Sequence, residues 1–425
     1  MFKKAYLASD IESKANKLMK ILHTADWHLG KRLEKYSRLE EQKQVLEEII
    51  QLADFHSVDV VLIAGDLFDA FNPPTEAVDL FYRTLRRLTS NGKRAVIAIA
   101  GNHDSPNRIE APDPLARECG IVFAGYPHTH VSVGELHSNV SVLRSEPGFI
   151  ELKFKDYDYP LRLILTPYAN EYRLKTFLGV ENEEDELRSI LQMGWQIIAD
   201  KYCDENGVNL LMTHLFLMKK GETPLPEPED EKPILHIGGA QAIYSENIPS
   251  QIQYTALGHL HRHHRVGGST APVVYSGSPL SYSFGEAGQE KAVILIDAVP
   301  NHPVEYLKVP LSSGKRLHRK KFEGLEEALL WLSENQEALV ELTLVSDDYM
   351  SSDERKALYQ AHSGIITMIP EVRNKDILRD EGSSIDLNQS IDELFGQYFQ
   401  FKHGQLPNEE IIELFKEIRA EQIEG

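Results

Sequence analysis

From Met19 to about Val299, short apolar runs alternate with longer stretches in which apolar residues recur every three or four positions. The short runs are typical of strands covered on both faces, because such strands carry apolar side chains at consecutive positions. These predicted strands span residues 58–64, 94–100, 161–166, 208–213, 254–257 and 292–296. The longer stretches predict amphipathic helices at residues 39–55, 75–88 and 184–202. Such alternation predicts an α/β domain with largely buried sheets.

A different pattern follows residue 300, where glycine- and histidine-containing turn motifs end. In order come a basic segment, a helix, a strand, a second helix pattern and a strand-like run, and four of them lie at residues 315–321, 325–332, 339–345 and 364–369. This order predicts a small α+β domain. The chain is thereby divided into an N-terminal extension at 1–18, an α/β domain at 19–300, the α+β domain at 301–382 and terminal helices at 383–425.

The tail carries two predicted helices. Ser390 and Glu393 form a capping-box pair before the first, and Asn408 can cap the second. Both helices carry more apolar side chains than so small a unit is expected to bury. They therefore either bind a partner or dock on the chain's own body.

The composition is that of a globular protein without membrane spans. No run of about eighteen apolar residues occurs, and the N-terminus lacks the apolar core of a signal peptide. Two widely separated cysteines, Cys119 and Cys203, suit a reducing cytoplasm. The 45 basic and 65 acidic residues give a net charge of −20, which disfavours a protein that grips DNA by itself. A site that binds divalent cations nevertheless needs carboxylates and gains positive charge from the ions.

Five motifs place potential metal ligands directly after predicted strands. They are Asp26-Trp27-His28, Gly65-Asp66-Leu67-Phe68-Asp69, Gly101-Asn102-His103-Asp104, Thr213-His214 and Gly258-His259-Leu260-His261. Functional groups in α/β sheets gather at the carboxyl ends of strands, so these side chains are expected to meet. Carboxylate, amide oxygen and imidazole without thiolate suit manganese or iron, with zinc as an alternative. Two ions about 3.5–4 Å apart would clamp a phosphate, and Asp66 could bridge them.

Taken singly, each motif has an ordinary structural explanation. The chain has 17 histidines, and a lone histidine is far more often structural or on the surface than a ligand. His23 is expected either in the core or directly behind the ligands, and Trp27 is expected to pack. His263 and His264 are left out as ligands. It is the combination of five motifs, each behind an apolar run, that predicts a two-metal centre.

These residues resemble the calcineurin-like metallophosphoesterase superfamily, through the motifs DWH, GDLFD, GNHD, TH and GHLH. The phrases HTADWHLGK, AGDLFDAFNPP and GSPLSYSFGE are similar to its SbcD family of bacterial nucleases. The resemblance implies a sandwich of two mixed sheets flanked by helices, followed by a small α+β domain that caps DNA. It also implies that the C-terminal helices bind a coiled-coil ATPase of the SbcC type, with a homodimer inside a heterotetramer.

The same resemblance assigns roles to residues. The first metal would be held by Asp26, His28, Asp66 and His261, and the second by Asp66, Asn102, His214 and His259. The two ions are expected to be Mn²⁺, with Mg²⁺ as the alternative. His103 would protonate the leaving 3′ oxygen or stabilise the transition state, and Asp104 would orient His103 by a hydrogen bond. Archaeal and eukaryotic relatives carry a histidine at the position of Asp69, so no role is transferred to it.

The leading hypothesis is a metal-dependent DNA nuclease of the cytoplasm that acts in repair, recombination and replication. The resemblance implies a 3′-to-5′ exonuclease on duplex ends and an endonuclease at hairpins. The basic segment at 315–321 would contribute to DNA binding together with a partner, or would be only a solvated connector. The alternative is a phosphatase or small-molecule phosphodiesterase, which would need only the α/β domain. A non-catalytic scaffold is expected to lack at least one ligand or catalytic residue, but all eight of these residues are present.

Overall fold

The computed structural model describes residues 17–137, 139–174, 183–223, 242–346, 350–373 and 390–403, together with 407, 412 and 415. By contacts within the chain, it divides into two units. The first comprises Met1–Leu344 and Asp353–Ile369, and the second comprises Val345–Ser352 and Pro370–Gly425. Of the proposed N-terminal extension, only Lys17 and Leu18 fall among the described residues.

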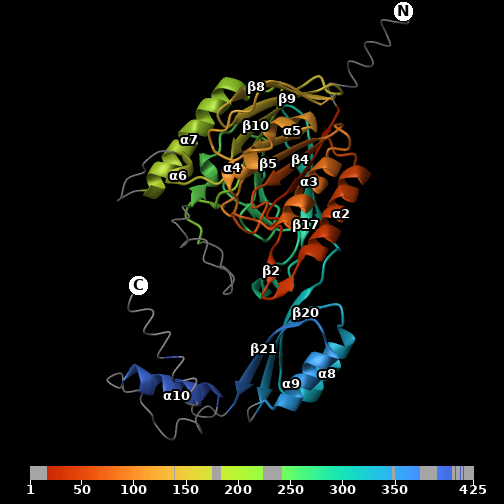
Figure 1. Cartoon of the computed structure of the whole chain (residues 1–425). Helices are drawn as coiled ribbons and strands as arrows, with labels where there is room; N and C mark the ends of the chain where they lie inside the picture. Colours follow the sequence, from red (N-terminus) through yellow and green to blue (C-terminus); the bar gives the residue numbers. More distant parts are fainter. Residues whose placement is uncertain are drawn as a thin grey trace, which may run out of the picture. The chain divides into compact units, whose positions relative to one another are not determined.

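Six strands form the first sheet of the α/β domain. Their order is β18 (Glu305–Pro310), β17 (Ala292–Ala298), β1 (Met19–Thr24), β4 (Val60–Ala64), β5 (Ala95–Ile99) and β6 (Ile121–Ala124). The last four run parallel to one another, whereas β17 and β18 are antiparallel to their neighbours. Helices α2 (Leu39–Phe55) and α3 (Thr75–Leu88) cover one face of this sheet, and Ile49 and Phe81 join its side chains in one apolar cluster (Figure 1).

Eight strands form the second sheet. Their order is β15 (His264–Val266), β16 (Val273–Tyr275), β14 (Tyr254–Leu257), β11 (Val208–Thr213), β10 (Leu161–Thr166), β9 (Phe149–Phe154), β8 (Val140–Glu146) and β7 (Gly134–His137). The central strands β10, β11, β14 and β16 are parallel. Helix α7 (Glu183–Tyr202) covers the outer face, where Leu191 and Trp195 pack against Ile164 and Leu211.

The two sheets pack face to face. Ile21, Leu62 and Ile97 of the first sheet share one buried cluster with Leu163 and Met212 of the second. Because helices cover the outer faces as well, the central strands are buried on both sides, which explains their consecutive apolar residues. Figure 1 shows the strands between α2 and α3 on one side and α7 on the other. The predicted sandwich of two mixed sheets flanked by helices is confirmed.

Short elements connect these layers. They are β2 (Arg32–Leu33), β3 (Tyr36–Ser37), α4 (Pro106–Glu110), α5 (Asp113–Glu118), α6 (Glu171–Leu174), β12 (Leu217–Met218), β13 (Ile243–Tyr244), η1 (Ser245–Asn247) and η2 (Phe284–Glu286). The hairpin β2–β3 and η2 carry Leu33 and Phe284, which pack in a buried cluster with Leu317 and Leu339 of the small domain.

The small domain is a three-stranded sheet with two helices. Its strands lie in the order β19 (Leu317–Phe322), β20 (Leu339–Ser346) and β21 (Ile365–Val372), and its helices are α8 (Leu325–Glu334) and α9 (Ser352–Ala361). Most of the basic segment therefore lies in an edge strand, β19, and is not a simple connector. Leu317 and Phe322 of β19 are buried, while Arg319 and Lys321 are exposed.

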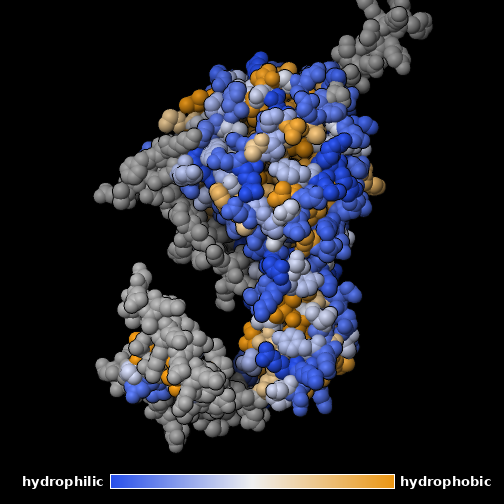
Figure 2. Space-filling view, viewed as in Figure 1, coloured by the Kyte–Doolittle hydropathy of each residue, from blue (hydrophilic) through white to orange (hydrophobic). Residues whose placement is uncertain are grey.

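The second unit contains α10 (Ile391–His403). The predicted capping box is confirmed, because the backbone N–H of Ser390 donates to Oε2 of Glu393 at 3.0 Å and that of Glu393 donates to Oγ of Ser390 at 3.3 Å. Asn408 and the start of the second predicted helix lie outside the described residues. Among the described helices, none is long and apolar enough to span a membrane. Figure 2 shows a mostly hydrophilic face with apolar side chains scattered over it.

Candidate metal centre

The carboxyl ends of strands from both sheets carry the predicted ligands. Asp26 and His28 follow β1, Asp66 follows β4, and His259 and His261 follow β14. Four of these five have a positive φ, namely 53° at Asp26, 42° at His28, 48° at Asp66 and 96° at His259. Residues with a Cβ rarely adopt this conformation, and where they do, the strain clusters at functional sites. The backbone is therefore bent to aim these side chains inward.

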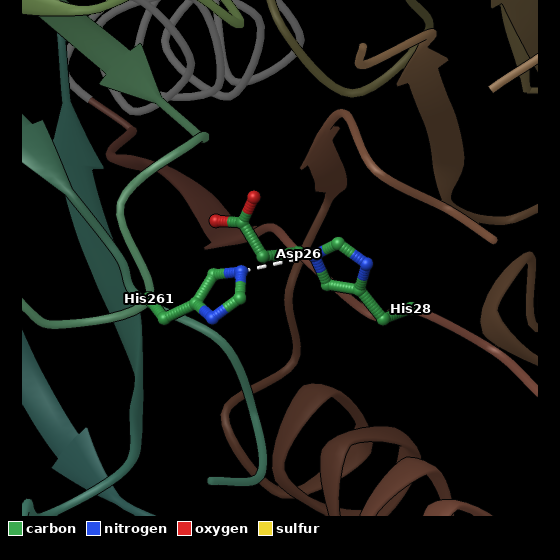
Figure 3. Close-up of side chains that lie close together, drawn as sticks. All are labelled: Asp26, His28 and His261. Carbon is green, nitrogen blue, oxygen red and sulfur yellow. Dashed lines mark hydrogen bonds between the residues drawn. The ribbon is translucent and has the colours of Figure 1, made fainter. Parts of the chain in front are cut away.

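Asp26, His28 and His261 form one cluster, drawn in Figure 3, in which one ligand atom from each lies within 4.8 Å of the others. The Nε2 atoms of His28 and His261 are 3.0 Å apart. The side chains of Asp26 and His28 are fully buried, and His261 is half-buried. Two imidazoles that approach through their ring nitrogens repel unless a proton or a cation lies between them.

Asp66, His214 and His259 form the second cluster. Oδ1 of Asn102 lies between the two histidines, 3.0 Å from Nε2 of His214 and 3.1 Å from Nδ1 of His259. Oδ2 of Asp66 is 3.3 Å from Nε2 of His214 and 3.5 Å from Nε2 of His28 in the first cluster. Asp66 therefore contacts both clusters.

Two glycines make this close approach possible. A Cβ at Gly65, where φ is 91°, would lie 2.2 Å from Nδ1 of His214, and a Cβ at Gly101 would lie 2.1 Å from Oδ1 of Asp66. No larger residue fits at either place without moving a predicted ligand.

The electrostatics of the protein without ions reveal strong competition for protons. Burial raises the pKa of Asp26 to about 7. Burial opposes ionisation of Asp66 too, but the neighbouring His214 and His103 hold its pKa well below the usual value. At His214 burial is outweighed by the carboxylates of Asp66 and Asp26, which raise its pKa to about 9. Burial and the nearby His214 lower the pKa of His259 to about 3. Without bound ions, His214 therefore keeps a proton, and its positive charge lies beside the carboxylates of Asp66 and Asp26.

Several observations fit divalent cations at these positions. Oδ2 of Asp26 and Nε2 of His259 are buried, and neither has a hydrogen-bond partner among the described residues. Buried polar atoms without a partner are costly and point to an unseen ligand. The donors are carboxylate oxygen, amide oxygen and imidazole nitrogen, which suit borderline and hard divalent ions.

His103 borders the first cluster, and its ring centroid lies 4.9 Å from that of His28. Its backbone N–H donates to Oδ1 of Asp66 at 2.9 Å, and its Nδ1 lies 2.8 Å from the carbonyl oxygen of Asp69. The side chain of Asp69 also forms an ion pair with Lys31 at 2.8 Å and lies 3.6 Å from Nδ1 of His28.

The prediction that Asp104 orients His103 by a hydrogen bond is wrong. The buried carboxylate of Asp104 accepts instead from the backbone N–H groups of Leu67, Phe68 and Gly101, at 3.0, 2.9 and 2.8 Å. It thereby joins the loop after β4 to the loop after β5. The physical reason is that three backbone donors at the turns are satisfied by one carboxylate, while the backbone carbonyl of Asp69 lies next to the ring of His103.

The residues expected to pack do so. His23 is buried, with Nδ1 3.0 Å from the hydroxyl of Tyr254 and Nε2 3.1 Å from the carbonyl oxygen of Leu257. Trp27 is buried and donates from Nε1 to Oγ1 of Thr24 at 3.1 Å.

Sequence reasoning missed two residues that support the site. The guanidinium of Arg173, in α6, donates to the carbonyl oxygens of Gly101 at 2.7 Å and Asp104 at 2.9 Å. The carboxylate of Glu286 lies 3.2 Å from Nδ1 of His261. Arg173 has no local signal in the sequence, whereas Glu286 ends the phrase GSPLSYSFGE and could have been questioned there.

Paired sheets with a buried cluster of oxygen and nitrogen donors at their strand ends suit a metal-dependent enzyme. Residues 19–262 match the family described as calcineurin-like phosphoesterase. Curated relatives narrow the assignment. The chain is 37% identical over 412 residues to the SbcD subunit of the nuclease SbcCD from Bacillus subtilis, covering 95% of this chain and 98% of that protein.

Two further relatives carry the same name. The protein of Rhodobacter capsulatus is 31% identical, over 69% of this chain and 72% of its own length. That of Escherichia coli K12 is 29% identical, over 80% of this chain and 81% of its own length. The chain therefore belongs to the SbcD family of calcineurin-like phosphoesterases.

Proposed function

We propose that this chain is the nuclease subunit of an SbcCD-type complex and hydrolyses DNA phosphodiesters with two divalent cations. The observation that carries the proposal is the position of Asp66, whose Oδ2 lies 3.5 Å from a histidine of one ligand cluster and 3.3 Å from a histidine of the other. The names of the relatives supply the nucleic-acid substrate.

The proposed ligands follow the two clusters. Asp26, His28, Asp66 and His261 would hold one ion, and Asp66, Asn102, His214 and His259 the other. When bound, a pair of such ions polarises a phosphoryl oxygen and lowers the pKa of bound water to near neutrality. We propose Mn²⁺ in both positions, with Mg²⁺ as the alternative.

His103 is proposed as the proton donor to the leaving 3′ oxygen. Its Nδ1–H donates to the carbonyl oxygen of Asp69, so Nε2 is the ring atom left to exchange a proton with substrate. The backbone N–H of His103 is tied to Asp66, which fixes the ring beside the proposed ligands. An orienting hydrogen bond of this kind is what a general acid needs. Asp104 acts on catalysis through the backbone of the same loop.

The remaining segments are proposed to serve DNA and the ATPase. Residues 301–382 would cap bound DNA, and the exposed basic side chains of β19 would contact its phosphates. Residues 383–425 would bind the coiled-coil SbcC-type ATPase through α10. A homodimer of this chain would lie inside the heterotetramer, and the complex would act in the cytoplasm in DNA repair, recombination and replication.

A nuclease assay tests the function. Hairpin and blunt duplex DNA are incubated with the purified chain and Mn²⁺, Mg²⁺ or a chelator, with and without the ATPase partner. We expect Mn²⁺-dependent 3′-to-5′ degradation of the duplex and opening of the hairpin, with no cleavage in chelator. A small phosphodiester serves as the comparison substrate. Faster turnover of that compound than of either DNA would favour the phosphatase or small-molecule phosphodiesterase alternative.

A further inference from the structure

Glu286 is a buried carboxylate in contact with one of the proposed metal ligands. It lies at the end of η2 and is 1% exposed. Its Oε1 lies 3.2 Å from Nδ1 of His261 and accepts the backbone N–H of Tyr282 at 3.0 Å. Its Oε2 contacts Nζ of Lys291. Both oxygens of this buried carboxylate therefore have polar partners.

The contact with Glu286 decides which nitrogen of His261 faces the cluster. A carboxylate accepts hydrogen bonds, so the ring proton of His261 lies on Nδ1, where it donates to Glu286. Nε2 is then the unprotonated ring nitrogen, and it lies 3.0 Å from Nε2 of His28 within the proposed first site. Hydrogen bonding of this kind fixes the tautomer and increases the basicity of a metal-binding histidine.

Lys291 holds this arrangement in place. Its Nζ donates to the carbonyl oxygen of His261 at 2.8 Å and to Oγ of Ser278 at 3.1 Å, besides its contact with Glu286. The lysine therefore fixes both the carboxylate and the backbone of the histidine. The side chains of Lys291 and Glu286 are 9% and 1% exposed, so water weakens their attraction little.

His214 offers an instructive contrast. Its Nδ1 donates to a backbone carbonyl, that of Ala64, at 2.7 Å. Such a neutral acceptor orients the ring but adds less basicity than a carboxylate does. The carboxylate nearest His214 is that of Asp66, 3.3 Å from its Nε2, and Asp66 is itself a proposed metal ligand. Glu286 is not a proposed ligand, and it contacts a buried lysine.

We propose that Glu286 is a positioning residue that orients His261 and strengthens its Nε2 as a metal ligand, with Lys291 as the fixed counter-ion. This inference rests on the proposed role of His261 in the first metal site. Glu286, 25 residues after His261, thereby makes η2 part of the proposed metal centre without being a ligand itself.

The test measures binding of Mn²⁺ to the metal-free full chain, with free ion counted from its electron paramagnetic resonance signal. The variants are Glu286→Gln and the double variant Glu286→Gln/Lys291→Met, which leaves no unpaired buried charge. Glu290→Gln is the matched control, since Glu290 is an exposed carboxylate in the same segment. We expect one of the two ions to bind about 10–100-fold more weakly in both Glu286 variants, and wild-type binding in the control. With Co²⁺ in place of Mn²⁺, the visible absorption band should also shift, which a general loss of stability would not cause.

Melting of the metal-free proteins is recorded to confirm that each variant folds. Wild-type affinity for both ions in a folded Glu286→Gln protein would overturn the proposal. So would weakened binding in Glu286→Gln that is restored in the double variant, because the stranded lysine would then be the cause. His261→Ala distinguishes the two levels of inference. If that variant bound two ions normally, the metal site itself would be misassigned, whereas a loss confined to His261→Ala would refute the role of Glu286 alone.

Discussion

Nε2 of His28 lies 3.0 Å from Nε2 of His261, although 233 positions separate the two residues in the chain. His28 follows the first strand of one sheet, and His261 follows β14 of the other. The proposed first site therefore exists only when both sheets are packed together. Loss of packing between the sheets should abolish metal binding before either sheet unfolds.

Replacement of His103 should separate chemistry from metal binding. In His103→Gln, we expect cleavage of duplex DNA to fall by about 10²–10⁴-fold, the range that a general acid supplies. Bound Mn²⁺ should stay at the wild-type stoichiometry, because the ring is assigned no ion. Initial rates of cleavage and metal content measured on the same preparation check this. Wild-type rates in the variant would remove His103 from the mechanism.

Replacement of Asp66 should remove both ions together. Because its carboxylate approaches both clusters, Asp66→Ala should retain neither Mn²⁺ at a concentration that saturates the wild type. Asp79→Ala provides the control, since Asp79 is an exposed carboxylate of α3 that pairs with Arg83. Equilibrium dialysis followed by elemental analysis counts the ions. One ion retained at full affinity would contradict the bridging role.

Metal affinity should rise with pH. Ligation requires an ionised Asp26 and a neutral His214, whose pKa values in the protein without ions are raised to about 7 and about 9. Between these values His214 alone must release a proton, so the apparent affinity should increase about tenfold per pH unit. Below about pH 7 Asp26 is protonated too, and the dependence should steepen. Calorimetric titration from pH 6.5 to 8.5 measures it, and a flat profile would show that these groups do not bind the ions.

Because Asp104 accepts three backbone hydrogen bonds, its replacement should lower the stability of the fold as well as the activity. In Asp104→Ala the N–H groups of Leu67, Phe68 and Gly101 lose their acceptor, at a cost of about 1–3 kcal/mol for each group left buried and unsatisfied. Urea denaturation of the metal-free chain should show a clearly lower midpoint. Asp104→Asn keeps one acceptor oxygen and should lie between the two. An unchanged midpoint in the alanine variant would mean that water replaces the carboxylate.

The C-terminal tail should be required for binding of the ATPase partner but not for cleavage of DNA. A chain ending at residue 380 should keep metal-dependent nuclease activity but lose co-purification with the coiled-coil ATPase. Because Tyr398 on α10 is 57% exposed, Tyr398→Asp should weaken the same interaction by placing charge in an apolar contact. A pull-down with the purified partner compares the three proteins. Full retention of the truncated chain would move the contact elsewhere.

The strands and helices with strong periodicity were predictable almost to the residue. Helices at 39–55 and 75–88 and strands at 161–166, 208–213 and 254–257 have the predicted bounds. The second sheet's outer strands β7, β8 and β9 were not predicted. In β8, buried and partly exposed positions mix, because this strand lies near the sheet edge and is only partly covered. β9 is buried almost throughout, but Glu151 and Lys153 interrupt its apolar run and weaken the pattern there.

The candidate site also has one part that the sequence predicts and another that it does not. Ligand types and their places after strands are local properties, since a turn that follows a buried strand is short and carries its polar residues in a few consecutive positions. Which side chains meet is decided by the pairing of two sheets. His103 is fixed by a hydrogen bond that its Nδ1–H donates to the carbonyl oxygen of Asp69, and no side-chain motif reveals a backbone acceptor.

By itself, then, the amino-acid sequence determined the buried strands, the helices that cover them and the inventory of candidate metal ligands, because each depends on burial or on chemistry within a few residues. Only the tertiary structure decided that Glu286 contacts His261, that Asp104 accepts from three backbone amides, and that the carbonyl oxygen of Asp69 orients His103. Those relationships depend on atoms brought within about 3 Å by the packing of distant segments, and hydrophobic periodicity carries no information at that precision.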